Sequence, residues 1–368
     1  MPKVLVAGAS GLVGHAALEQ FASMSGWEVI GVSRRVPHDV PGATLLSVDL
    51  LDPAACDDAF DQLSDVTHLV YAALQEDPGL MPGWTDPAVM DRNDRMLRNL
   101  FEPLSKVATG LEHISLLHGT KAYGLHHPSV REQGGVHIPL REREPRREHP
   151  NFYFLQEDYL REKQRDASWG MTVFRPTVIY GDAAGNNMNP ILAIAAYAAL
   201  LREQGEPLHF PGHETTPVLR EAVDARLVAR ALAWAATSPN ARNQTYNLTN
   251  GDVFIWQNVW PAIAEALGME PGEQRPISFV QDLPRQNDAW AAIVEKYNLD
   301  ASKDIAEFAG YNSLVYADVM MGGGRQQSLP TLNSTIKGRQ DGFHDCIDTE
   351  DMFRELFASL RTTGKFPR

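Results

Sequence analysis

Three glycines near the start of the chain have the spacing of a turn that binds phosphate groups. The segment Gly8-Ala9-Ser10-Gly11-Leu12-Val13-Gly14 follows the apolar run Lys3–Ala7 and precedes a helical pattern that continues to Phe21. In such a strand–turn–helix unit, the first glycine permits the tight turn and the second lets the backbone approach a pyrophosphate. The third lets the helix pack closely against the strand, and free amides at the helix start favour negative charge. A turn that only joins strand to helix is the alternative. The motif predicts a dinucleotide site at Gly8, Ser10, Gly11, Leu12, Val13 and Gly14.

Two arginines end the next apolar run and bear on the type of dinucleotide. Residues 27–32 form a strand-like pattern that ends in Ser33-Arg34-Arg35. A site that prefers NAD usually carries an acidic residue here, which binds the ribose 2′-hydroxyl. A guanidinium instead matches a 2′-phosphate in charge and in its planar fork of donors. Ser33, Arg34 and Arg35 therefore predict NADPH rather than NADH, and a solvated basic turn is the alternative.

Strand and helix patterns alternate over the first half of the chain, which must position these groups. Further strand-like runs and helical patterns cover residues 44–48, 66–73, 86–107, 112–117, 154–166 and 171–176. Such alternation predicts an α/β fold of the Rossmann type, with a doubly wound parallel sheet and helices on both faces. In this fold, ligands bind beyond the carboxyl ends of the strands. Further cofactor contacts are therefore expected from residues at or after strand ends, namely Asp49, Leu50, Ala72, Ala73, Pro176 and Val178.

The regular alternation ends near Gly181, which indicates a second, smaller portion. Residues 1–181 are predicted to form a dinucleotide-binding Rossmann domain and residues 182–368 a helix-rich substrate-binding portion. Some strands and helices of the second portion are expected to return to the first. Its helical patterns and short strand-like run cover residues 189–203, 223–236, 256–267 and 245–248. The substrate is expected to bind in the crevice between the two parts.

A tyrosine held near a lysine would complete a reductase site of this kind. A bound nicotinamide supplies hydride, and the protein must stabilise the oxygen that gains negative charge. A phenol can do this, with an ammonium that lowers the phenol pKa and contacts the nicotinamide ribose. Short-chain dehydrogenases usually carry the pair as Tyr-x-x-x-Lys on one helix face. Tyr159 and Lys163 fit this spacing, whereas Tyr153 is followed four positions later by Glu157.

A series of short segments spans almost the whole chain and occurs in the order of one known family's motifs. The segments are Gly8-Ala9-Ser10-Gly11-Leu12-Val13-Gly14, Val32-Ser33-Arg34-Arg35, His118-Gly119-Thr120-Lys121-Ala122-Tyr123-Gly124, Pro150-Asn151-Phe152-Tyr153, Phe174-Arg175-Pro176, and Lys337 with Asp341-Gly342-Phe343. With them the chain resembles the progesterone 5β-reductase and iridoid synthase family of extended short-chain dehydrogenase/reductases. The lysine segment and the Asn-Phe-Tyr segment are the most distinctive.

The resemblance implies a catalytic pair other than Tyr159 and Lys163. In this family the lysine comes from the Thr-x-Lys-x-Tyr-Gly segment and the tyrosine opens the following helix. Lys121 and Tyr153 are therefore the implied catalytic residues, and both are expected to contact the cofactor. Asn151 would cap the helix that carries the tyrosine. The expected apolar walls of the substrate pocket are Phe152, Trp84 and Phe343.

The implied activity is an NADPH-dependent 1,4-reduction of the activated C=C bond in an α,β-unsaturated carbonyl compound, by a homodimer. Phe154 and His118 depart from the family pattern, so the resemblance does not identify the substrate. Three alternatives stay open. The chain could reduce a carbonyl group, act as a nucleotide-sugar epimerase or dehydratase, or sense NADP(H) without turnover.

Charge and composition argue against other classes of protein. The chain has 33 Lys and Arg against 47 Asp and Glu, a net charge of −14, which would repel nucleic acid and anionic membranes. The longest apolar run, residues 191–201, is shorter than the roughly 20 residues of a membrane-spanning helix. Neither the two cysteines nor the histidines show a metal-binding spacing, and no secretory pattern opens the sequence. The expectation is a cytoplasmic enzyme with no metal, no nucleic-acid partner and no membrane contact.

Overall fold

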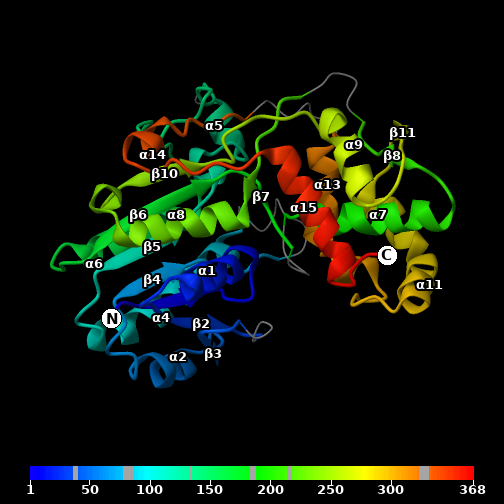
Figure 1. The fold of residues 1–368 in the computed structure, drawn as a ribbon. Coiled ribbons are helices and arrows are strands. Elements are labelled where there is room, and N and C mark those ends of the chain that lie inside the picture. Colours follow the sequence, from blue (N-terminus) through cyan, green and yellow to red (C-terminus); the bar gives the residue numbers. More distant parts are fainter. Residues whose placement is uncertain are drawn as a thin grey trace.

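A seven-stranded parallel sheet forms the first part of the molecule (Figure 1). The computed structural model describes residues 1–35, 40–77, 84, 86–132, 134–182, 188–213, 218–322 and 331–368. The sheet order is β3-β2-β1-β4-β5-β6-β10, so the order of the strands reverses between β1 and β4. The strands are β1 (Lys3–Ala7), β2 (Glu28–Ser33), β3 (Ala43–Ser47), β4 (His68–Tyr71), β5 (His113–Leu117), β6 (Gly170–Pro176) and β10 (Thr245–Leu248). The predicted fold class is confirmed.

Helices cover both faces of this sheet because successive side chains of each strand point to opposite faces. On β1, Val4 and Val6 pack in the core beneath α1 (Leu12–Ser23) and α8 (Ala225–Thr237). Leu5 and Ala7 pack in the core on the opposite face. That face is covered by α2 (Pro53–Phe60), α4 (Pro87–Val107) and α6 (Phe152–Gln164). Burial on both faces explains why these strands read as continuous apolar runs.

Two capping side chains set where the helices next to the cavity begin. The Asp86 carboxylate accepts a hydrogen bond from the Ala88 amide, and Pro87 occupies the first turn of α4. The Asn151 side chain accepts from the Tyr153 amide, so α6 begins at Phe152, two residues before the start expected at residue 154. This shift places Tyr153 in the first turn of α6.

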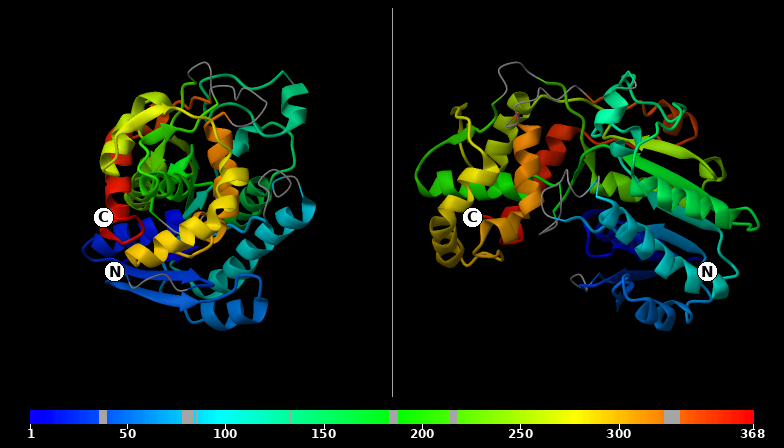
Figure 2. Two further views of the ribbon diagram at one scale, coloured as in Figure 1. Left: turned by 90° about the vertical axis from the view of Figure 1, so that its right-hand side faces the viewer. Right: turned by 180° about the vertical axis from the view of Figure 1, so that it is seen from behind.

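The second part of the chain is rich in helices and lies beside the sheet (Figures 1 and 2). Its central helix α7 (Ile191–Glu203) is buried on nearly every side, which is why it reads as one long apolar run. The surrounding helices are α9 (Trp256–Ala266), α10 (Phe279–Asp282), α11 (Asn287–Tyr297), α12 (Ile305–Ala309), α13 (Tyr311–Met320) and α15 (Thr349–Thr362). Two small parallel sheets join this part, one of β8 (Leu208–Phe210) with β11 (Pro271–Gln274), the other of β7 (Ile179–Tyr180) with β9 (Val223–Asp224).

The chain crosses between the two parts more than once. After α7 it returns to form α8, which packs on α1, and β10, which pairs with β6 at the edge of the sheet. The short elements α5 (Pro128–Glu132) and α14 (Ile336–Gln340) lie on the same side of the molecule as β10. No helix within the described ranges is both long and apolar enough to span a membrane.

Candidate active site

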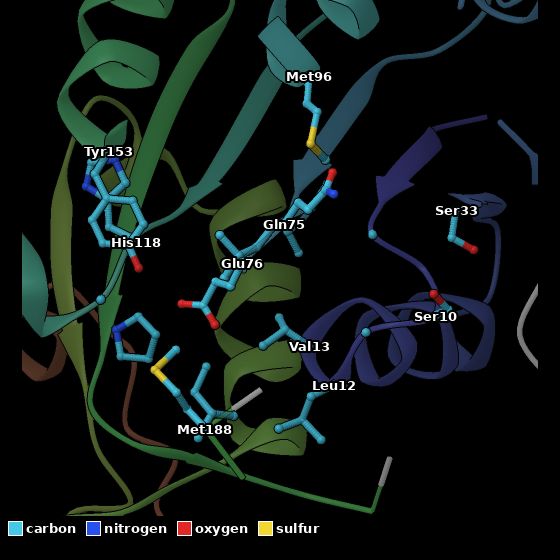
Figure 3. Close-up of a pocket in the computed structure, with 18 of the residues that line it drawn as sticks. Ser10, Leu12, Val13, Ser33, Gln75, Glu76, Met96, His118, Tyr153 and Met188 are labelled. Carbon is cyan, nitrogen blue, oxygen red and sulfur yellow. The ribbon is translucent and has the colours of Figure 1, made fainter. Parts of the chain in front are cut away.

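A cavity of about 390 Å³ opens at the carboxyl ends of the strands, where the strand order reverses (Figure 3). The glycine turn after β1 forms one wall, and the segment after β4 forms the floor. The segments after β5 and β6 form the opposite wall, together with the first turn of α6. Met188 and Tyr316 are contributed by the second part of the chain. A ligand in this cavity would therefore contact both parts, as the sequence predicts.

The glycine turn fits closely against its neighbours. Gly8 has φ +87°, and a Cβ there would lie 2.8 Å from the backbone of Ala72. A Cβ on Gly14 would lie 2.1 Å from the Gly8 carbonyl oxygen, so only glycine lets α1 start this close to β1. Gly11 caps α1 without a side-chain hydrogen bond, which leaves the first amides of the helix open to an anionic group. Of the predicted turn residues, Gly14 is the one that packs behind the cavity instead of lining it.

The far end of the cavity carries the predicted arginines. Arg34 and Arg35 are exposed at its rim, and Ser33 donates its hydroxyl hydrogen bond to the Arg35 carbonyl oxygen. The Ser47 hydroxyl donates to the Arg34 carbonyl oxygen at 3.1 Å, which fixes the backbone of this turn and leaves the guanidinium groups unused by it. The remaining predicted residues that line this region are Asp49, Leu50, Ala72, Ala73, Pro176 and Val178.

One amide side chain positions both the tyrosine and the lysine. The Asn151 Oδ1 accepts from the Tyr153 amide at 3.0 Å, and its Nδ2 donates to the Lys121 carbonyl oxygen at 3.1 Å. Beside them, a Cβ on Gly119 would lie 3.3 Å from the Tyr153 hydroxyl, so the glycine makes room for the phenol. Asn151 therefore does more than cap α6, because it ties the start of that helix to the lysine segment.

The phenol of Tyr153 is buried and protonated. Its ring stacks on the His118 ring, with centroids 4.6 Å apart and planes inclined by 11°. Burial raises the pKa of Tyr153 above its usual value, and the charge of Glu76 adds to this effect. The expectation that the lysine ammonium lowers this pKa is not met, because burial dominates. Burial also lowers the pKa of His118 well below its usual value, so this ring is neutral.

The ammonium of Lys121 lies among three side chains at the same end of the cavity. Its Nζ lies 3.5 Å from the centroid of the Trp84 ring, donates to Met188 Sδ at 3.3 Å, and lies 4.0 Å from Glu76 Oε1. Burial lowers the pKa of Lys121 to about 7, and the Glu76 charge opposes this shift. The lysine is therefore poised between its charged and neutral forms near neutral pH.

The expected apolar walls differ in their placement. Trp84 lines the cavity, and Phe152 packs behind it with ring centroids 4.9 Å apart. Phe343 does not line the cavity, and instead packs on Trp234 with centroids 5.5 Å apart. The segment that carries Phe343 follows α14, which lies near the β10 edge of the sheet, so its ring covers the core below α8.

The alternative pair, Tyr159 and Lys163, lies outside the cavity. The Tyr159 hydroxyl donates to Glu102 at 2.7 Å, and the Lys163 Nζ lies 2.8 Å from the same carboxylate. Tyr159 is 4% exposed and packs edge-on against Phe101 and Trp169. The two residues thus link α6 to α4. They are less exposed than the surface pair that the sequence suggested.

Several residues that line the cavity carried no signal in the sequence. They include Gln75, Glu76, Met96, Met188 and Tyr316 (Figure 3 labels the first four). Gln75 and Glu76 follow β4 directly, so the rule that ligands bind beyond strand ends could have found them. Met188 and Tyr316 could not be found in this way, because their approach depends on how the second part packs. Within the described ranges, no group of three or more His, Cys, Asp or Glu side chains is arranged to hold a metal ion.

Comparison with known families identifies the chain. The model of the PRISE-like Rossmann-fold domain matches residues 53–367. The chain belongs to the PRISE-like Rossmann-fold family. The resemblance to the progesterone 5β-reductase and iridoid synthase family is thereby confirmed.

Individual relatives of this PRISE-like protein agree with that assignment. An (S)-8-oxocitronellyl enol synthase from Antirrhinum majus is 31% identical, over 97% of this chain and 91% of the relative. A second enzyme with that name, from Camptotheca acuminata, is also 31% identical over the same shares.

Among solved structures, UDP-glucose 4-epimerase from Thermotoga maritima with UDP-glucose superposes with a TM-score of 0.67 at 17% identity, over 98% of this chain and 99% of that one. The Thermus thermophilus UDP-glucose 4-epimerase in complex with NAD gives a TM-score of 0.65 at 20% identity, over the same shares. These two likenesses show the shared fold.

Proposed function

We propose that this PRISE-like protein is an NADPH-dependent reductase of the activated C=C bond in α,β-unsaturated carbonyl compounds. The carrying observation is the Tyr153 hydroxyl, which is buried in the cavity and lies next to the Lys121 segment, where Gly119 leaves room for it. The printed name of the relatives supports this reading, because they are enol synthases. Addition of hydride to the β-carbon of an unsaturated carbonyl compound leaves an enolate, which is the conjugate base of an enol.

The residues present fit a nicotinamide dinucleotide. The cradle formed by Gly8 and Gly11 and the open amides of α1 suit the pyrophosphate, since a Cβ on Gly8 would occupy this turn. Arg34 and Arg35 would hold a 2′-phosphate, which favours NADPH. When bound, the dihydronicotinamide supplies the hydride. The other residues that would contact it are Ser10, Leu12, Val13, Ser33, Asp49, Leu50, Ala72, Ala73, Lys121, Tyr153, Pro176 and Val178.

The side chains of this chain perform the rest of the reaction. Tyr153 keeps its proton, because burial raises its pKa, and it donates a hydrogen bond to the carbonyl oxygen of the substrate. This bond strengthens as the oxygen gains negative charge, so it lowers the barrier more than it strengthens binding. The Lys121 ammonium adds positive charge at the same end of the cavity. A water molecule then protonates the α-carbon of the enolate.

A substrate panel tests the proposal. NADPH oxidation is followed with 2-cyclohexenone, progesterone, an unsaturated aldehyde and a saturated aldehyde, and the products are identified by mass spectrometry. Turnover of at least one unsaturated compound to the saturated carbonyl or its enol is expected. Turnover of the saturated aldehyde alone would instead establish a carbonyl reductase.

Replacement of both Arg34 and Arg35 by alanine is expected to weaken NADPH binding about 10- to 100-fold and to leave NADH binding nearly unchanged. Charge-assisted hydrogen bonds to a phosphate contribute roughly 1.5–3 kcal/mol each, and these exposed groups lose part of that to solvent screening. Dissociation constants from nucleotide fluorescence measure the effect. Equal weakening for both nucleotides would show that the turn does not select the 2′-phosphate.

A further inference from the structure

A carboxylate forms part of the wall that faces Tyr153. Glu76 follows β4 in the turn that precedes α4, and its side chain is only 2% exposed. Figure 3 shows its carboxylate directed into the cavity, towards the side on which Tyr153 and Met188 lie. The mechanism proposed above assigns this group no task. A carboxylate beside a forming enolate opposes the charge that the site must stabilise, so its presence requires a reason.

The contacts of Glu76 join it to the lysine by two routes. The Trp84 Nε1 donates to Glu76 Oε1 at 2.5 Å, and the same Oε1 lies 4.0 Å from Lys121 Nζ. The face of the Trp84 ring lies 3.5 Å from that Nζ. Carboxylate, indole and ammonium therefore form a closed cluster in which each group contacts the other two. The Trp84 ring also packs edge-on against Tyr153, with centroids 5.2 Å apart.

We propose that Glu76 is a positioning residue that, together with Trp84, holds the Lys121 side chain as an ammonium beside Tyr153. This inference rests on the proposed function for its consequence in catalysis. Removing an ammonium from water is costly, and a partner carboxylate with good geometry offsets that cost. The indole contributes through its π face, which attracts a cation, and its N–H keeps the carboxylate oxygen in place.

Other titratable groups near the ammonium do not supply a negative charge. Tyr153 approaches from α6, and burial raises its pKa. Tyr316 approaches from α13, and burial likewise raises its pKa. His126 follows the segment that carries the lysine, and burial lowers its pKa to about 3, so it is neutral. Among the residues described, Glu76 is thus the anion that faces Lys121.

The consequence for activity has a definite sign. The Glu76 charge raises the pKa of Lys121 against the lowering caused by burial, and the balance is a pKa of about 7. If the carboxylate is neutralised, burial acts alone and the pKa of Lys121 falls below about 7. An activity that needs the ammonium is then lost at lower pH as the pH rises. At acid pH, where the lysine is charged in both proteins, the loss is smaller.

The experiment measures the titration of Lys121 in two independent ways in the wild type, in Glu76→Gln and in Glu76→Met. The first is the pH profile of kcat/KM for NADPH-linked enone reduction. The second is the pH dependence of acetylation of Lys121 in the protein without nucleotide, read by peptide mass spectrometry, since only the neutral amine reacts. Neutralisation is expected to move both midpoints down by about one pH unit or more, which is a tenfold change in the ammonium fraction above the midpoint.

Two further variants separate charge from packing. Glu76→Asp keeps the charge and is expected to keep both midpoints closer to the wild type than Gln or Met does. Glu157→Gln neutralises a carboxylate of α6 that pairs with Arg161 and lies 4.0 Å from His118, and it should leave the lysine midpoints unchanged. Midpoints in Glu76→Gln and Glu76→Met that equal the wild-type values would overturn the inference, whatever happens to the rate. The acetylation arm answers the question even if no enone is reduced, so failure of the proposed function is recognised separately.

Discussion

Tyr153→Phe is expected to lower kcat for enone reduction by about 100-fold or more, while the dissociation constant of NADPH changes little. Loss of one preorganised donor to a developing oxyanion costs roughly 10²–10³ in kcat. The phenylalanine keeps the ring stacked on His118 and the packing against Trp84, so the change removes little except the hydroxyl. Steady-state kinetics with the best substrate of the panel, together with nucleotide binding, measure the two quantities.

Tyr159→Phe is the matched control for this prediction. It removes a phenol from the same helix, but from one that donates to Glu102 and lies outside the cavity. We expect kcat within about twofold of the wild type and a small loss of stability, because a hydrogen bond to a charged group is removed. The opposite pattern, with Tyr159→Phe inactive and Tyr153→Phe active, would reject Tyr153 as the catalytic residue and favour epimerase-type chemistry.

Gly14→Ala is expected to destabilise the protein by about 3 kcal/mol or more and to abolish measurable nucleotide binding. The added methyl would lie 2.1 Å from the Gly8 carbonyl oxygen, and overpacking against side chains alone already costs roughly 1–3 kcal/mol. Here the opposing atom belongs to the backbone, so α1 must move away from β1 and the turn must open. Thermal unfolding and NADPH fluorescence titration report the two effects.

The control for the glycine variant is Gly110→Ala. A Cβ at this exposed position meets nothing within 4 Å, so its stability should stay within about 0.5 kcal/mol of the wild type. If Gly14→Ala unfolds at the wild-type temperature and binds NADPH normally, then the close approach of helix and strand is not what the motif requires.

The fold was largely predictable from local patterns. Strands buried on both faces read as apolar runs, and the predicted run at residues 245–248 coincides with β10, Thr245–Leu248. Helix α4 begins one residue after the expected position, because Asp86 is its cap rather than its first residue. What the patterns could not supply was the pairing of distant segments, such as β8 with β11, since neither short strand has a periodicity that identifies its partner.

The site was predictable where chemistry depends on consecutive residues. The glycine turn and the arginines after β2 are of this kind, and all of them except Gly14 line the cavity. Glu76 was missed because a single carboxylate after a strand resembles any polar turn residue, and only its contact with Trp84 and Lys121 distinguishes it. Phe343 was expected in the cavity from its family position, and its packing on Trp234 could not be read from the sequence.

The place of β10 at the edge of the sheet bears on how the protein is made. On the ribosome, β6 is complete after about 180 residues, but its outer neighbour is synthesised some 70 residues later, after α7 and α8. Until then the nascent chain presents an unpaired apolar strand, which is the kind of surface that chaperones bind. A fragment that stops at residue 181 would keep this edge permanently, so the nucleotide-binding half should not be expressed alone as a substitute for the whole enzyme.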